Sequence, residues 1–182
     1  MGGIVNGLAL HSKLIPYGST FLVFSDYMRP SMRLASLMKV NSLFIFTHDS
    51  IYLGEDGPTH QPVEHLMSLR LIPNLDVIRP SNSKELIHSY RYALEKRDNP
   101  TAIILSRQNM KFFDQDLSYK DFQTGAYEFR QGTDITLVAT GSEVELALEI
   151  STKLSDFSVQ IISAPILNLS LIHISEPTRQ AS

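Results

Sequence analysis

The stretch SLFIFTHDSIYLGEDGPTHQP, residues 42–62, joins an apolar run to a loop rich in polar and conformationally special residues. Its first six residues, SLFIFT, are apolar without alternation, which is typical of a strand that is buried on both faces. The sixteen residues from Thr47 to Pro62 hold two His, three carboxylates, two Gly and two Pro. Such a loop directly after a buried strand predicts a functional site at the carboxyl end of that strand.

Short apolar runs and longer amphipathic segments alternate on both sides of this stretch. Three more runs have the apolar character of strands: LIPY, LDVIRP and TAIILS, at residues 14–17, 75–80 and 101–106. The amphipathic segments predict helices at residues 19–40, 62–70 and 82–96. Strands that alternate with helices over short connections predict the fold class, an α/β fold with a parallel sheet flanked by helices.

Two segments carry the signature of a capping box, in which a polar N-cap residue is followed three positions later by Glu. Asn82 and Glu85 form one pair, and Ser142 and Glu145 form the other. The second pair opens a helical pattern between two strand-like runs, ITLVA and SVQIIS. The sequence therefore predicts a second strand–helix–strand unit late in the chain.

These patterns divide the chain into four parts. Residues 1–110 are predicted to form the first α/β domain, residues 111–124 a polar linker, and residues 125–169 the start of a second α/β domain. We expect this second domain to be truncated, because one strand–helix–strand unit cannot bury both faces of a sheet. Residues 170–182, SLIHISEPTRQAS, lack a periodic apolar face and are expected to be an anomalous tail.

The composition excludes several classes of function. The net charge is -3 and the pI is about 6.0, which argues against a nucleic-acid surface and against a polybasic membrane face. The chain has no Cys, so disulfides, thiolate metal sites and thiol catalysis are excluded. A reducing cytoplasm is the expected compartment.

Polar side chains at two strand ends are the first candidates for a binding site. His48 follows SLFIFT and Arg107 follows TAIILS, and open parallel sheets bind ligands beyond the carboxyl ends of their strands. The planar guanidinium of Arg107 suits a phosphate, although a structural ion pair would also explain it. His48 and Asp49 also permit a metal site, but no H-E-x-x-H spacing accompanies them. Asp56 fits either a simple turn or a site.

Three aromatic side chains, Phe21, Phe24 and Tyr27, recur at positions i, i+3 and i+6. This spacing favours an aromatic stripe in the core of the protein. The alternative is an aromatic wall for a flat heteroaromatic ligand, and periodicity alone leaves both open. Three further histidines are expected at the surface or on a helix face and are given no role: His11, His65 and His88.

Five segments, in this order and spacing, resemble the transketolase family: PYGSTFLVFSDY, THDSIYLGEDGPTHQPVEHLMSLRLIPN, RPS, SRQN and LVATGSEVELAL. The resemblance covers roughly residues 1–165. It implies the pyrimidine-binding middle domain of a thiamine-diphosphate enzyme, followed by the start of its C-terminal domain. The family transfers a two-carbon ketol unit from a ketose phosphate to an aldose phosphate in the pentose phosphate pathway.

The resemblance also implies how the cofactor is held. Phe24 matches the residue that stacks on the aminopyrimidine ring of thiamine diphosphate, with Phe21 and Tyr27 lining the same pocket. The family's Mg²⁺ ligands match no residue here and are expected in a separate N-terminal domain. The glutamate that activates the cofactor is likewise expected before the position of Met1.

Four residues match the family's substrate-binding set. His48 and Arg107 match the residues that bind the sugar phosphate, and Asp56 matches the carboxylate that recognises a substrate hydroxyl. His60 matches the catalytic histidine near the reacting carbon, which hydrogen-bonds substrate oxygens. These chemistries suit the roles, because cations bind phosphate, a carboxylate accepts from a hydroxyl, and imidazole moves protons.

Two alternatives to a transketolase fragment follow from the same residues. A related ketol transferase, such as dihydroxyacetone synthase, shares these motifs. A non-catalytic module that binds a cofactor or a partner belongs to a different class, and the unmatched glutamate favours it. The resemblance predicts that a complete parent is a homodimer and that the 182-residue chain alone is inactive. Residues 170–182 do not resemble the family and look like the translated read-through of a sequencing adapter.

Overall fold

The computed structural model describes residues 1–96 and 98–168, which form two β-sheets with helices packed against them. The first sheet has four parallel strands in the order β1-β2-β4-β3. Their bounds are β1 (Tyr17–Phe21), β2 (Leu43–Thr47), β4 (Thr101–Ile104) and β3 (Asp76–Ile78). This arrangement confirms the predicted α/β fold with a parallel sheet.

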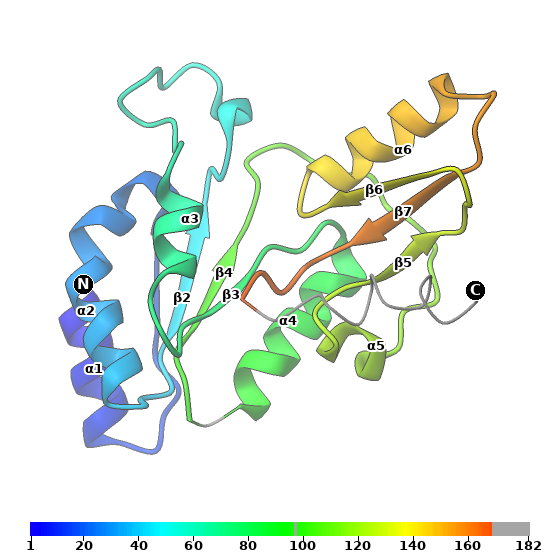
Figure 1. Ribbon diagram of the computed structural model, residues 1–182. Helices are drawn as coiled ribbons and strands as arrows, with labels where there is room; N and C mark the ends of the chain where they lie inside the picture. Colours follow the sequence, from blue (N-terminus) through cyan, green and yellow to red (C-terminus); the bar gives the residue numbers. More distant parts are fainter. Residues whose placement is uncertain (97, 169–182) are drawn as a thin grey trace.

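Helices cover both faces of the first sheet (Figure 1). Phe44 and Phe46 pack into a core with three helices, α1 (Gly2–His11), α2 (Ser25–Leu37) and α3 (His65–Arg70). Leu43 and Ile45 belong to the opposite core, which α4 (Ser83–Glu95) covers. Side chains of β2 alternate between two apolar layers, which explains why SLFIFT shows no alternation of polarity.

The second sheet has three strands in the order β5-β7-β6. The strands β6 (Ile135–Ala139) and β7 (Val159–Ser163) are parallel, and α6 (Glu143–Lys153) connects them and packs on one face. β5 (Tyr127–Arg130) pairs antiparallel with β7, so this sheet is mixed. The predicted strand–helix–strand unit is therefore present, with one additional antiparallel strand.

The two sheets meet through a small apolar cluster. Ile78 of β3 bridges Ile166, and both pack against Phe122 of α5 (Tyr119–Gln123). α5 lies inside residues 111–124, and its Phe122 side chain is fully buried. The division of the chain into domains and a linker stays a prediction, and the anomalous tail, residues 170–182, lies outside the described residues.

The helix predicted at residues 19–40 is wrong in its first third. Residues 17–21 form β1, a short 3₁₀ helix covers Leu22–Phe24, and α2 begins only at Ser25. β1 pairs with β2 over five residues, from Tyr17 with Leu43 to Phe21 with Thr47. This long-range pairing overrides the local helical pattern, and it also moves the first strand from residues 14–17 to β1.

The two capping boxes have different outcomes. Asn82 caps α4 as predicted, because its Oδ1 accepts from the backbone N–H of Glu85 at 3.0 Å. The predicted cap at Ser142 is wrong: its backbone is already helical, and its hydroxyl caps no backbone N–H of α6. None of the helices in residues 1–96 and 98–168 combines the length and the hydropathy of a membrane-spanning segment.

Candidate functional site

The aromatic side chains Phe21, Phe24 and Tyr27 lie together at the carboxyl end of β1. The ring centroids of Phe21 and Phe24 are 6.1 Å apart with the rings nearly parallel, and those of Phe24 and Tyr27 are 6.2 Å apart. Phe21 and Phe24 are half-buried, and Tyr27 is 83% exposed. The three rings therefore form an open aromatic surface and not a stripe in the core.

Two predicted site histidines pack against this surface. The imidazole of His48 stacks on Phe21 with ring centroids 3.7 Å apart and an interplanar angle of 22°. His60 meets Phe24 edge-on at 5.4 Å. In each histidine, Nδ1 lies 2.9 Å from the hydroxyl of the preceding threonine, Thr47 or Thr59. The structure thus gathers the predicted aromatic and imidazole side chains into one cluster, which we call the aromatic–histidine cluster.

The backbone of His48 adopts a left-handed conformation, with φ at +59°. For a residue with a Cβ this conformation costs about 1–2 kcal/mol, so surrounding contacts must hold it. Asp49 supplies one such contact, because its buried Oδ2 accepts from Nε of Arg79 at 2.7 Å. This ion pair explains the acidic residue beside His48 without a metal ion.

Asp56 and Arg107 are both exposed. Asp56 lies in a turn between Gly54 and Gly57, which both have positive φ. Arg107 is the third residue after β4. Within residues 1–96 and 98–168, no hydrogen bond or ion pair joins either side chain to the aromatic–histidine cluster. The structure places Asp56 after the carboxyl end of β2 and Arg107 after that of β4, as predicted, but shows no polar contact between either side chain and the cluster.

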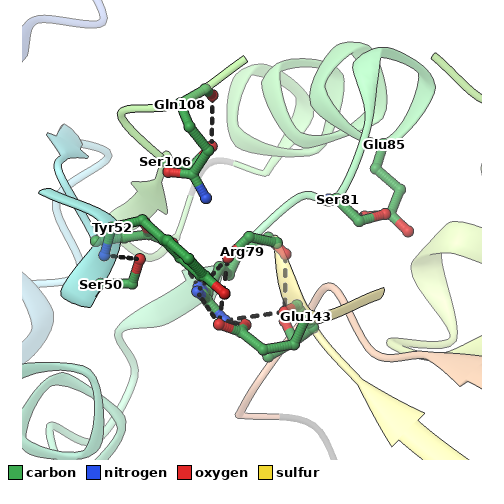
Figure 2. Close-up of polar contacts among 11 residues, drawn as sticks. Ser50, Tyr52, Arg79, Ser81, Glu85, Ser106, Gln108 and Glu143 are labelled. Atoms are coloured by element: carbon green, nitrogen blue, oxygen red, sulfur yellow. Dashed lines mark hydrogen bonds and ion pairs between the residues drawn. The ribbon is translucent and has the colours of Figure 1, made fainter. Parts of the chain in front are cut away.

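Arg79 is the functional candidate that the sequence prediction missed. It directly follows β3 and is 5% exposed (Figure 2). Besides Asp49, its guanidinium donates to both carboxylate oxygens of Glu143, to the carbonyl of Thr140 and to the hydroxyl of Ser142. Burial disfavours its charge, but Glu143 and Asp49 outweigh that effect and raise the pKa of Arg79. Its position after a buried strand is the signal that singled out Arg107, and it applies equally to Arg79.

Glu85 forms a second buried polar centre between the two sheets. Its carboxylate accepts from the backbone N–H of Ser81, from the Tyr127 hydroxyl at 2.8 Å and from the Ser163 hydroxyl. Burial raises the pKa of Glu85, although these donors favour its charged form. Figure 2 shows Ser81 and Glu85 at the start of α4, beside the Arg79 centre.

His65 was expected at the surface or on a helix face; it is the first residue of α3, but it is buried, with 5% of its surface exposed. Its Nδ1 accepts from the backbone N–H of Val63, and its Nε2 lies 3.2 Å from Oδ2 of Asp26. Asp26, Glu64 and His65 bring three possible metal ligands within 4.8 Å of one another. Both ring nitrogens already have partners, so an Asp–His pair accounts for the cluster without a metal ion.

Comparisons with known proteins agree with these features. Residues 1–112 match the family model described as transketolase, pyrimidine binding domain. Transketolase from Treponema pallidum is 48% identical over 169 residues, which is 90% of this chain and 25% of that protein. The chain thus spans about a quarter of the length of this curated relative.

Solved structures give the same result. The structure of transketolase from Leishmania mexicana superposes with a TM-score of 0.88 at 40% identity, over 98% of this chain and 27% of that one. A transketolase from Pichia stipitis, solved in complex with sedoheptulose-7-phosphate, superposes with a TM-score of 0.86 at 36% identity, over 97% of this chain and 26% of that one. The parallel sheet, the aromatic–histidine cluster and these matches lead to one conclusion: the chain belongs to the transketolase family, through its pyrimidine-binding domain.

Proposed function

We propose that this chain forms part of an enzyme that transfers a two-carbon ketol unit between sugar phosphates with thiamine diphosphate. The observation that carries this proposal is the aromatic–histidine cluster. It combines an open aromatic surface with two imidazoles at the strand ends. Ketol transfer needs both parts, because one binds a flat heteroaromatic ring and the other exchanges protons with a polar substrate.

The aromatic side chains fit the pyrimidine ring of the cofactor. Phe24 is half-buried, so its ring is fixed by packing while part of it stays available for stacking. Phe21 lies nearly parallel to it, and Tyr27 extends the same surface toward solvent. When bound, thiamine diphosphate supplies the carbanion-stabilising chemistry of the reaction. The role of the three side chains is to orient the pyrimidine ring and to exclude water from it.

The remaining site residues bind the substrate in this proposal. Arg107 and His48 bind the phosphate, Arg107 through its planar fork and His48 through a single ring N–H. Asp56 accepts a hydrogen bond from a sugar hydroxyl. His60, fixed edge-on against Phe24, donates to substrate oxygens and holds a proton near the reacting carbon. The sedoheptulose-7-phosphate bound to the Pichia stipitis relative supports a sugar phosphate as the substrate class.

The rest of the active site is proposed to come from the segments that relatives carry outside the matched quarter. We place the Mg²⁺ ligands, the diphosphate-binding groups and the activating glutamate there. We also propose that the complete enzyme is a homodimer and that the 182-residue chain alone shows no turnover.

A segment exchange tests the proposal. Residues 1–168 replace the matching segment of the Treponema pallidum transketolase, and ketol transfer is followed with a ketose phosphate and an aldose phosphate. We expect turnover in this exchanged enzyme. Phe24→Ala should raise the KM for thiamine diphosphate about 5- to 150-fold, because stacking an aromatic side chain on a base contributes about 1–3 kcal/mol.

Phe157→Ala is the matched control, because Phe157 is 52% exposed and lies outside the cluster. It should leave that KM unchanged. Equal effects of Phe24→Ala and Phe157→Ala on the KM for the cofactor would contradict the proposed cofactor wall.

A further inference from the structure

The guanidinium group of Arg79 joins residues that follow one strand of each sheet. Its Nε donates to Asp49, which lies two residues after β2 of the first sheet. Its Nη1 and Nη2 donate to Thr140, Ser142 and Glu143, which lie between β6 and the first turn of α6. Figure 2 shows Arg79 at the centre of these contacts, with Glu143 facing its guanidinium.

Every N–H group of the Arg79 guanidinium has an acceptor. Arginine has five side-chain N–H groups, and the five acceptors are Asp49 Oδ2, Thr140 O, Ser142 Oγ and the two carboxylate oxygens of Glu143. Four of these five acceptors belong to residues 140–143. These residues, between β6 and the first turn of α6, are called the second sheet region below. They set the orientation of the guanidinium, and Asp49 accepts from the one remaining N–H.

The backbone of Arg79 is held by the same region. Its N–H donates to the carbonyl of Pro165 at 2.8 Å, and its carbonyl accepts from the backbone N–H of Gly141 and the hydroxyl of Thr140. A Cβ at Gly141 would lie 2.7 Å from Nε of Arg79, so only glycine leaves room for the arginine there. Side chain and backbone together leave Arg79 a single arrangement.

Glu143, Arg79 and Asp49 form a chain of contacts that ends next to His48. Asp49 is its direct neighbour, and a buried, fixed carboxylate at Asp49 restricts the left-handed backbone of His48. That backbone places the imidazole 3.7 Å over the ring of Phe21. A change at Glu143 can therefore reach the aromatic–histidine cluster through Arg79 and Asp49.

We propose that Arg79 is a positioning residue that lets the second sheet region set the orientation of His48. The chain of contacts runs from Glu143 through Arg79 and Asp49 to the backbone of His48. Its consequence for phosphate binding rests on the proposed function, in which His48 binds the sugar phosphate. Its structural part, that the His48 ring depends on Glu143, stands independently of that function.

The structural part is tested on the 182-residue chain by NMR of the histidine rings, with the His48 signals assigned by His48→Gln. Glu143→Gln and Arg79→Lys should both shift the His48 ring signals, because Gln removes the charge and Lys offers three donors in place of five. His88 is the internal reference, because it contacts the carbonyl of Leu117 and no member of the chain of contacts. Its signals should not move.

Glu145→Gln is the matched control variant. Glu145 lies on the same first turn of α6 and pairs with Lys111, away from Arg79. It should leave the His48 signals unchanged. Unchanged His48 signals in folded Glu143→Gln and Arg79→Lys would overturn the proposal, as would equal shifts in Glu145→Gln. If Arg79→Lys does not fold, Glu143→Gln alone decides, because Gln is isosteric with Glu and the Glu143 side chain is partly exposed.

Kinetics in the exchanged enzyme separate this proposal from the proposed function. Glu143→Gln should raise the KM for a phosphorylated ketose about fivefold to tenfold and leave the KM for an unphosphorylated ketose unchanged. Suppose that the His48 NMR signals shift but that Glu143→Gln changes the KM for the two ketoses equally or not at all. His48 is then positioned by Arg79 but does not bind phosphate. In that case the proposed function fails in its phosphate subsite, and the positioning role remains.

Discussion

Phe21 and His48 stack face to face, with ring centroids 3.7 Å apart, at the carboxyl ends of two neighbouring strands. Phe21 ends β1, and its register partner Thr47 ends β2 directly before His48. The parallel pairing of these strands thus brings together two side chains that lie 27 positions apart in the sequence. The proposed cofactor wall therefore directly contacts His48, one of the two residues of the proposed phosphate subsite.

His48→Ala should weaken use of phosphorylated sugars by about 10-fold relative to unphosphorylated ones, because one ring N–H bound to a charged oxygen is lost. The measurement is kcat/KM for both substrate types in the exchanged enzyme. His11→Ala serves as the control, because His11 is exposed at the end of α1. An equal loss for both substrate types would show that His48 acts on folding or on the cofactor wall only.

Asn82→Ala should lower the free energy of unfolding by about 1 kcal/mol, because it removes the side-chain cap of α4. Chemical denaturation of the 182-residue chain measures the change. Asn82→Ser should retain most of the stability, since serine can accept the same hydrogen bond from the backbone N–H of Glu85. Equal losses for Ala and Ser would mean that packing, and not capping, is what Asn82 provides.

Glu85→Gln should remove a pH dependence of stability. Burial raises the pKa of Glu85 above the ordinary glutamate value of 4.5, so the folded state binds this proton more tightly than the unfolded state. The stabilisation from Glu85 is therefore fully present below pH 4.5 and is lost as the pH rises through the folded pKa. The free energy of unfolding of the wild type minus that of Glu85→Gln should therefore decrease as the pH rises from 4.5 through the folded pKa of Glu85.

Glu95→Gln is the control with the opposite sign. Glu95 lies exposed on the same helix, and its hydrogen bond with Arg91 lowers its pKa. The stability of the wild type minus that of Glu95→Gln should fall as the pH decreases below 4.5. The same sign for both glutamates would contradict the burial argument for Glu85.

Gly141→Ala should destabilise the chain by at least about 1 kcal/mol, because Gly141 has φ at +56° and its Cβ would collide with Arg79. Gly3→Ala is the matched control, because Gly3 lies in α1 with open space around its missing Cβ. That substitution should stabilise the chain by about 0.5–1 kcal/mol. Thermal unfolding of both variants gives the comparison, and a neutral Gly141→Ala would contradict the tight fit around Arg79.

Local signals predicted much of the fold. The uniformly apolar runs SLFIFT and TAIILS contain β2 and β4, which are central strands covered on both faces. Asn82 with Glu85 marked the start of α4 within one residue. Each of these features depends on residues close in sequence, so a single segment carries enough information to predict it.

The errors arose where distant residues decide the structure. β1 pairs with β2, which overrides the helical spacing around Phe21. The hydroxyl of Ser142 contacts Arg79, 63 positions away, and caps no helix. Asp26 lies 39 positions from His65 in sequence, and its carboxylate is a partner for Nε2 of the buried His65 ring. α1 was not predicted because its N-cap, Met1, offers no side-chain signal.

The aromatic–histidine cluster was predicted in its members but not in its geometry. The sequence spacing of Phe21, Phe24 and Tyr27 favoured a core stripe over an open aromatic wall, and only the exposure of these side chains in the folded chain separates the two. Arg79 was missed because its partners, Asp49 and Glu143, lie on either side of it in sequence and meet only in the fold.

The central claim, that this chain provides the sugar-phosphate side of a transketolase site, is tested most directly by Arg107→Ala in the exchanged enzyme. The measurement is the ratio of kcat/KM for a phosphorylated ketose to that for its unphosphorylated counterpart. Loss of a charge-assisted bidentate contact costs about 2–4 kcal/mol, so the ratio should fall about 30- to 1000-fold. An unchanged ratio, with an equal decrease in kcat/KM for both substrates, would contradict the account and show that Arg107 is a structural residue.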